Sequence, residues 1–298
     1  MQSKSGSPLA ATAIFFTLGA LLAFTWDQTP SLESLQSDQE DIQEVNAQTY
    51  QELEDLFEHY EYTWPPTQQL SKFIITRKFP ANVSTISDPS FRKEFFIKIL
   101  YPIVELENLA LERQHSFAIA IRDQNQWPED ANTSAWLIDT LAEYKVVNKD
   151  FDKAINQLID KLDSVPTKLV IAQAAIESGW GTSRFALEGN SLFGQWTYAK
   201  NMGLTPTDRE QGKRHQVRAF KNLRMSVRSY LQNINKNHAY RELRLLRKKA
   251  RDNNLRPNAL QLAEGLFRYS QRGHEYVKEI KQIINSKTLR AVPSFQDT

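Results

Sequence analysis

An apolar helical stretch that stops abruptly at two glycines is the feature that most constrains the fold of this chain. The apolar residues of segment 165–176 recur at the three-to-four spacing of a helix face that packs in a core. Ser164 is suited to cap this helix, with Pro166 in its first turn. Gly179 is suited to the left-handed residue that ends a helix, and Gly181 follows it. We therefore expect a core helix that ends at Gly179.

A single carboxylate, Glu177, stands in the last turn of this helix, beside its apolar face. The negative end of the helix dipole disfavours a carboxylate there by roughly 0.3–1 kcal/mol. Partial burial beside Ile176 and Trp180 disfavours the charge further. Both effects raise the pKa of Glu177, as a general acid near neutral pH requires. The residues by themselves also allow an ordinary exposed glutamate near a helix end.

The residues around and after Glu177 form a recognisable pattern. Residues 177–181 read Glu-Ser-Gly-Trp-Gly, and Asn190 and the Leu-Phe-Gly of 192–194 follow. This block resembles the glucosaminidase family of peptidoglycan hydrolases (glycoside hydrolase family 73) and, within it, the Bax-type proteins. Segments 220–230 and 269–277 resemble two downstream motifs of the same family.

The resemblance covers about residues 140–288. It implies a mainly α, lysozyme-like α+β fold with a small β-hairpin lobe and a cleft for a polysaccharide chain. It also implies an endo-β-N-acetylglucosaminidase, which cleaves the β-1,4 bond after N-acetylglucosamine in peptidoglycan without a cofactor. By position in the motifs, Glu177 is implied to be the general acid. Tyr269 is implied to be the active-site tyrosine that orients water or the N-acetyl group of the substrate.

The second catalytic carboxylate is less well defined. Glycosidases with two carboxylates hold them roughly 5–5.5 Å apart when they retain configuration and 6.5–9.5 Å apart when they invert it. In the family the partner of the acid lies on a β-hairpin, which corresponds here to residues 198–217. Asp208, four residues before Gly212, fits the family spacing better than Glu210. The second carboxylate is therefore Asp208, Glu210 or neither, and the stereochemistry of the reaction stays open.

Two other functions also stay open. A lytic transglycosylase of similar fold needs only one acid, and it leaves anhydro-muramic products where a hydrolase leaves a new N-acetylglucosamine end. A catalytically inactive peptidoglycan-binding envelope protein would account for a departure near Tyr269. Residues 270–273 read Ser-Gln-Arg-Gly there, where the family has an aspartate.

Aromatic and amide side chains near Glu177 are suited to bind a sugar, because aromatic rings pack well against the C–H faces of sugar rings. The residues that we expect to bind substrate are Gln173, Trp180, Phe193, Gln195, Trp196 and Tyr276. Trp196 is the better platform and Phe193 belongs more to the core. Gln195 is suited to bond an N-acetyl carbonyl, and Asn190 to fix the backbone of the turn.

Composition excludes several kinds of chemistry. The 298 residues include no cysteine, so disulfides, thiol nucleophiles and cysteine-based zinc sites are absent. The five histidines are scattered without the spacing of metal ligands. No dinucleotide-binding, P-loop or serine-hydrolase motif occurs. We expect no metal and no cofactor.

The N-terminus has the character of a targeting segment. Residues 9–26 carry no charge, and eighteen residues are about the shortest membrane span. Lys4 precedes this segment, Asp27 follows it, and the next basic residue is Lys72. This charge bias places the body outside the cytoplasm, in the periplasm or its equivalent. We favour an uncleaved signal anchor over residues 1–26, with a cleaved signal peptide as the alternative.

Charge divides the rest of the chain. Residues 27–61 hold eleven acidic side chains and no Lys or Arg, so we expect an acidic tether over residues 27–63, largely disordered or solvated, with one short helix near Leu53 and Phe57. The chain beyond residue 61 holds 36 of the 37 basic and 24 of the 35 acidic side chains. A cationic body suits anionic peptidoglycan. No nucleic-acid recognition motif accompanies the charge.

Most of the remaining sequence has helical spacing. It predicts helices over 91–113, kinked at Pro102, and over 116–122, 135–144 and 151–162, with two more capped by Asn222 and Asn258. A strand signal is confined to 203–220. We expect a helical N-terminal extension over 64–139, the catalytic domain over 140–288 and a tail over 289–298. The sequence indicates no oligomeric state.

Overall fold

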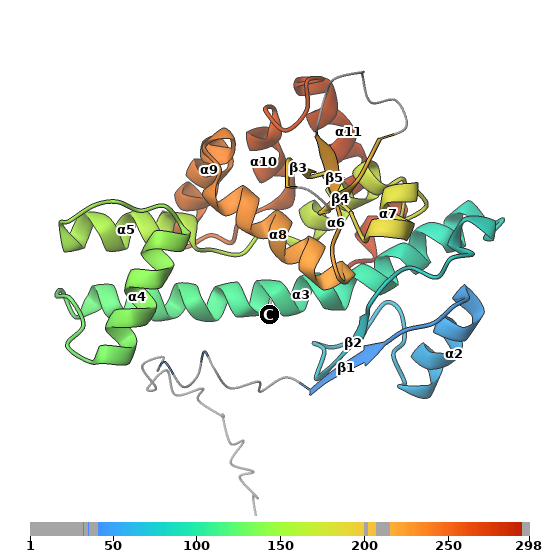
Figure 1. Cartoon of the computed structure of the whole chain (residues 1–298), viewed down its shortest axis with the longest axis horizontal. Coiled ribbons are helices and arrows are strands. Elements are labelled where there is room, and N and C mark those ends of the chain that lie inside the picture. The colour runs from blue at the N-terminus through green and yellow to red at the C-terminus, as the bar shows by residue number, and fades with distance from the viewer. Residues whose placement is uncertain (1–31, 33–34, 36–40, 200–201, 207–214, 294–298) are drawn as a thin grey trace, which may run out of the picture.

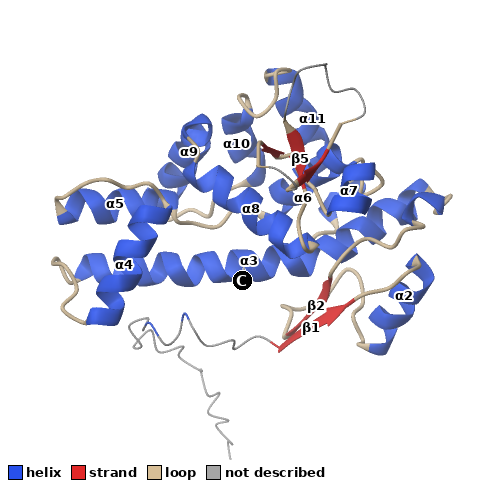
Figure 2. Ribbon diagram, viewed as in Figure 1, coloured by secondary structure: helices blue, strands red, loops and turns tan. Residues whose placement is uncertain are grey.

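The computed structural model describes residues 32, 35, 41–199, 202–206 and 215–293, and it is mainly helical with two small sheets (Figures 1 and 2). The elements are β1 (Asp41–Val45), α2 (Tyr50–His59), β2 (Lys72–Thr76), η1 (Val83–Thr85), α3 (Pro89–Asp123), α4 (Ala131–Glu143), α5 (Phe151–Lys161), α6 (Thr167–Ser178), α7 (Arg184–Gly189), β3 (Trp196–Thr197), β4 (Gly203–Leu204), β5 (Gln216–Arg218), α8 (Leu223–Lys236), η2 (His238–Tyr240), α9 (Arg241–Asp252), α10 (Ala259–Leu262), η3 (Ala263–Leu266), α11 (His274–Ile284) and α12 (Lys287–Arg290).

Helix α3 runs through the length of the molecule, and Figure 1 shows the C-terminal helices on one side of it. The side chain of Asp88 caps this helix by accepting from the backbone N–H of Ser90, and Pro89 opens its first turn. We predicted two helices here, but α3 is one helix of 35 residues that continues through the buried Pro102. It packs against α5, α6, α8 and β2, so residues N-terminal to the family motifs build the core beneath them.

The acidic segment folds against the body from Asp41 onward. Strand β1 pairs in parallel with β2, with Val45 opposite Thr76, and Leu53 and Phe57 of α2 are buried. The short helix is therefore confirmed, and the expectation that strands are confined to 203–220 is wrong. Most of residues 27–40 of the expected tether lie outside the described residues, whereas β1 and α2 hold residues 41–45 and 50–59 in regular structure. Burial of apolar side chains drives this docking, and a salt bridge joins Glu44 of β1 to a basic residue just after β2.

Helix α6 packs against α3, α10 and α11, and its residues 169–175 are buried, as its apolar composition requires. It begins at Thr167 with Pro166 in the N-cap position and no side-chain cap. The prediction that Ser164 caps it is wrong, because Pro166 occupies the N-cap position; the Ser164 hydroxyl donates instead to Glu112 Oε1 of α3 at 2.9 Å. It ends as predicted at Gly179, which is left-handed with φ 59° and ψ 45°.

A small antiparallel sheet in the order β3-β5-β4 forms the predicted β lobe, with Trp196 and Leu204 both opposite Val217. Strand β4 of this lobe packs against α7. Asp208 and Glu210 of the connecting segment lie outside the described residues, as does the predicted anchor over residues 1–26. In the described part of the chain, no helix combines the length and apolarity that a membrane span needs.

Candidate active site

The chain turns sharply after α6 because three successive residues adopt positive φ: Gly179, Trp180 and Gly181. A glycine is required at position 181, since a Cβ there would stand 2.9 Å from the ring of Phe79. The Ser178 hydroxyl accepts from the backbone N–H of Gly181 at 3.0 Å and fixes the turn. This local rigidity holds the last turn of α6, and Glu177 with it, in one orientation.

Glu177 is partly buried and bonded on one of its two oxygens. Its Oε1 accepts a hydrogen bond of 2.9 Å from the hydroxyl of Tyr276 on α11. Its Oε2 faces Gly194, where an added Cβ would stand 3.9 Å away. Burial raises the pKa of Glu177 most strongly, while the Tyr276 bond and Arg272 lower it and Glu279 raises it. The net direction is upward, as expected from the sequence, and favours the protonated acid.

A layer of aromatic side chains supports this corner. Tyr269 stacks on Tyr276 with ring centroids 5.3 Å apart, and Phe193 stacks on Tyr230 at 4.0 Å. The Tyr269 hydroxyl donates to the backbone carbonyl of Phe193 at 3.1 Å. Tyr269 therefore secures the loop before Gly194 in this structure. Its role in orienting water or the N-acetyl group stays a prediction.

Gln173 does not line the surface that we expected it to line. Its side chain is fully buried, and its amide bonds the hydroxyls of Tyr230 and Tyr276. Tyr276 is 1% exposed. Both residues lie behind Glu177, within the core, so their burial is at odds with direct substrate contact.

Gln195 and Trp196 lie at the edge of the β lobe. The Gln195 Nε2 donates to the backbone carbonyl of Ser229 at 3.3 Å, and its Oε1 is buried without a partner among the described residues. Gln195 thus presents an acceptor, whereas we expected a donor to an N-acetyl carbonyl. Trp196 is 63% exposed and stacks on His215 at 4.5 Å. A flat, open aromatic face of this kind is suited to a sugar ring.

Trp180, expected near the substrate, packs against α3. Its ring meets Phe96 edge-on at 5.6 Å, with Lys93 Nζ 5.2 Å from the ring centroid. Asn190 adopts the left-handed conformation and donates to the Phe220 carbonyl at 3.0 Å, which agrees with the predicted backbone role. Trp180 thus belongs to the scaffold that links the catalytic turn to α3.

The ion pair of Arg272 and Glu279 was not predicted from the sequence, and both of its charges shift the pKa of Glu177. Glu279 stands three residues after Tyr276 on α11, and residues at that spacing share a helix face. This spacing is the sequence signal that would have found it. Among the described residues, no three His, Asp or Glu side chains gather closely enough to hold a metal ion.

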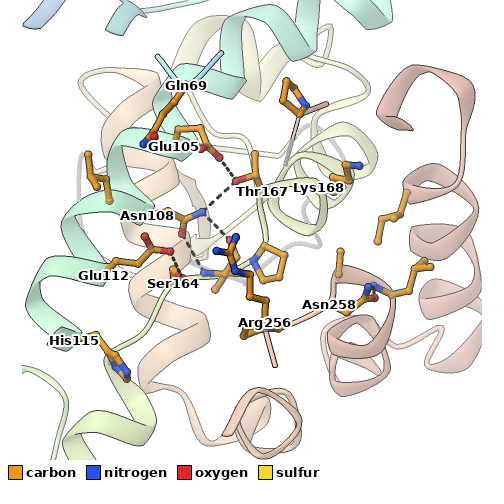
Figure 3. Close-up of a pocket in the computed structure, with 18 of the residues that line it drawn as sticks. Gln69, Glu105, Asn108, Glu112, His115, Ser164, Thr167, Lys168, Arg256 and Asn258 are labelled. Atoms are coloured by element: carbon orange, nitrogen blue, oxygen red, sulfur yellow. Dashed lines mark hydrogen bonds between the residues drawn. The ribbon is translucent and has the colours of Figure 1, made fainter. Parts of the chain in front are cut away.

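A cavity of about 760 Å³ lies at the other end of α6, near Thr167 (Figure 3). Ten residues separate Thr167 from Glu177, which places them about 15 Å apart along the helix. Glu105 lines this cavity, and burial raises its pKa to about 6, although a bond from Thr167 lowers it and Glu112 raises it again. A cavity with a perturbed carboxylate is a rival candidate for an active site.

Several polar side chains of this cavity form hydrogen bonds that hold the chain in place. Four α3 side chains bond the segment that leads into α6, as Figure 3 shows for three of them. The pairs are Glu105 with Thr167, Asn108 with Val165, Glu112 with Ser164 and His115 with Leu162. This ladder positions the start of α6. The corner at Glu177, which carries the sequence motifs, is the better candidate site.

Comparison with known proteins agrees with this choice. A family model described as glucosaminidase, mannosyl-glycoprotein endo-beta-N-acetylglucosaminidase, matches residues 152–289, which include Glu177 and exclude α3. Protein bax of Escherichia coli (strain K12) is 30% identical over 202 residues, which cover 67% of this chain and 69% of that protein. No solved structure matches the chain. The resemblance in the sequence motifs is thereby confirmed.

Proposed function

This chain belongs to the glucosaminidase family, and from that membership we propose that it hydrolyses peptidoglycan with Glu177 as the general acid. The bond cleaved is the β-1,4 linkage after N-acetylglucosamine, in the manner of an endo-β-N-acetylglucosaminidase of lysozyme-like fold. The observation that carries the proposal is a partly buried carboxylate with a raised pKa at the family motif, which among the described residues is bonded on one oxygen. The cationic body suits the anionic polymer.

The reaction needs one proton donor and one base. Glu177 gives its proton to the glycosidic oxygen as the bond from that oxygen to the sugar C1 breaks. Water adds to C1 and gives its proton to a base, so that a new N-acetylglucosamine reducing end forms. Asp208 is our preferred base and Glu210 the alternative. Trp196 offers its open ring to a sugar face.

We also propose that the chain acts in the cell envelope. The uncharged segment after Lys4 would anchor it in the inner membrane, with the body on the periplasmic or extracytoplasmic side. Peptidoglycan strands would then be within reach of the β lobe. Protease accessibility of the body in intact spheroplasts would test this topology, and a fully protected body would contradict it.

Turbidity of purified cell wall tests the catalytic assignment. The protein would lack residues 1–26, a deletion that removes none of the described residues. Glu177→Gln is nearly isosteric and should lower the rate of clearing by about 100-fold or more, since general acids contribute about 10²–10⁴-fold. Glu105→Gln, which alters the other carboxylate with a raised pKa, is the matched control and should clear at the wild-type rate.

Each other outcome has a definite meaning. Equal rates for wild type and Glu177→Gln would remove the acid from the mechanism. A wild type that binds wall but never clears it across a wide pH range would favour the inactive binding protein. Anhydro-muramic products would favour a lytic transglycosylase, which needs only one acid.

A further inference from the structure

A chain of hydrogen bonds runs from the core to Glu177 and is not part of the proposed chemistry. The Tyr230 hydroxyl donates to Gln173 Oε1, and Gln173 Nε2 donates to the Tyr276 hydroxyl at 3.1 Å. Tyr276 in turn donates to Glu177 Oε1 at 2.9 Å. Tyr230 and Gln173 are fully buried. Water therefore does not compete for these bonds.

The direction of the chain determines which oxygen of Glu177 can hold a proton. A phenol hydroxyl has one hydrogen to donate. Because Tyr276 accepts from the Gln173 amide, its own hydrogen goes to Glu177 Oε1. Oε1 is then an acceptor in both charge states of the acid. In the neutral acid the proton lies on Oε2, the oxygen that faces Gly194.

Tyr230 is the group that fixes this direction. The orientation of a glutamine amide follows from its hydrogen-bond network. If the Gln173 amide were reversed, its NH₂ would meet Tyr230, whose hydroxyl hydrogen would lose the acceptor that it has among the described residues. The amide oxygen would then take the hydrogen of Tyr276, and Glu177 would have to donate inward to Tyr276. The acid proton would be held against the core.

We propose that Tyr230, Gln173 and Tyr276 are positioning residues that keep the acid proton of Glu177 on Oε2, toward Gly194. The catalytic consequence rests on the proposed function, whereas the location of the proton does not. The chain sets the face from which a glycosidic oxygen receives its proton. Tyr230, fully buried and two hydrogen bonds away from Tyr276, thereby acts on the acid.

Carbon-13 NMR of labelled glutamate side chains tests the proton location without any substrate. The signal of Glu177 is identified by its loss in Glu177→Gln, and its titration is followed in each variant. Tyr276→Phe removes the donor that stabilises the carboxylate, so the pKa of Glu177 should rise. Tyr230→Phe frees the amide to reverse, so the pKa should rise as well, by less.

The matched control is Tyr62→Phe, which also removes a buried tyrosine hydroxyl with a hydrogen bond, to the Lys98 carbonyl at 2.9 Å. It should leave the Glu177 titration unchanged. The other groups that act on Glu177 are the same in all variants: Arg272, Glu279, Tyr269 and Tyr240. A wild-type titration in Tyr230→Phe would overturn the proposal, even if Tyr276→Phe fails to fold.

Kinetics on purified wall give the second readout. Tyr230→Phe should lower kcat roughly tenfold and leave KM unchanged. This loss is smaller than the roughly 10²–10⁴-fold that a general acid contributes, because Glu177 itself is retained. The alkaline limb of its pH profile should move to higher pH with the pKa of Glu177. A change in KM alone would contradict the proposal. If the wild type is inactive, the proposed function fails, and the NMR titration still decides where the proton lies.

Discussion

Replacement of Glu105 by glutamine should stabilise the fold near neutral pH and leave activity intact. Burial beside Thr167 raises the pKa of Glu105 from 4.5 to about 6. The folded state therefore binds this proton more tightly than the unfolded state does. The stability contributed by the proton is fully present below pH 4.5 and is lost as the pH rises through about 6.

The size of the effect follows from the shift. About 1.5 pKa units correspond to about 2 kcal/mol at 25 °C. Glutamine does not titrate, and it keeps an oxygen to accept from the Thr167 hydroxyl. Glu105→Gln should thus gain up to about 2 kcal/mol in free energy of unfolding at pH 7.5 and nothing at pH 4.

Urea denaturation of both proteins between pH 4 and pH 7.5 measures this difference. A difference that does not change with pH, or that favours wild type at pH 7.5, would refute the electrostatic reasoning. Unchanged clearing of cell wall by the same variant would separate the structural carboxylate from Glu177. A loss of clearing comparable to that of Glu177→Gln would assign catalysis to the cavity.

Three further predictions concern the scaffold. Gly265→Ala should lower the free energy of unfolding by about 3 kcal/mol, because the added Cβ would stand 2.3 Å from the backbone of Leu243. A melting temperature equal to that of wild type would contradict the packing of η3 on α9. Glu107→Gln leaves Arg224 and Arg228 of α8 without their buried carboxylate, so urea denaturation should show a loss of about 3 kcal/mol in the free energy of unfolding. A loss below about 1 kcal/mol would show that these ion pairs stabilise the fold only weakly. A fragment of residues 140–288 lacks α3 and should unfold without a cooperative thermal transition, whereas the chain from residue 27 should unfold cooperatively. A fragment that folds by itself would show that the catalytic domain does not need α3.

Local signals in the sequence predicted local structure well. The caps at Asn222 and Asn258 and the left-handed Gly179 depend on a few neighbouring residues, and all three are confirmed. The burial of Leu53 and Phe57 within a short helix follows equally from spacing. These elements could be predicted because their energetics are contained within one or two helical turns.

Contacts between distant segments could not be predicted in the same way. The parallel pairing of Val45 with Thr76 depends on contacts between segments far apart in the sequence. The acidic composition around Val45 favoured a solvated segment instead. Ser164 lies before the N-cap residue Pro166, and its hydroxyl donates to Glu112 on another helix, a contact that local sequence does not reveal. Gln173 was predicted to meet substrate because its place one turn before Glu177 is visible in the sequence, whereas its buried tyrosine partners are not.

The most direct test of the account is mass spectrometry of wall fragments released in oxygen-18 water by wild type and by Glu177→Gln. We expect wild-type products that end in N-acetylglucosamine labelled with one oxygen-18, and almost no products from the variant. Unlabelled anhydro-muramic ends, or equal amounts of product from both proteins, would contradict hydrolysis driven by this acid.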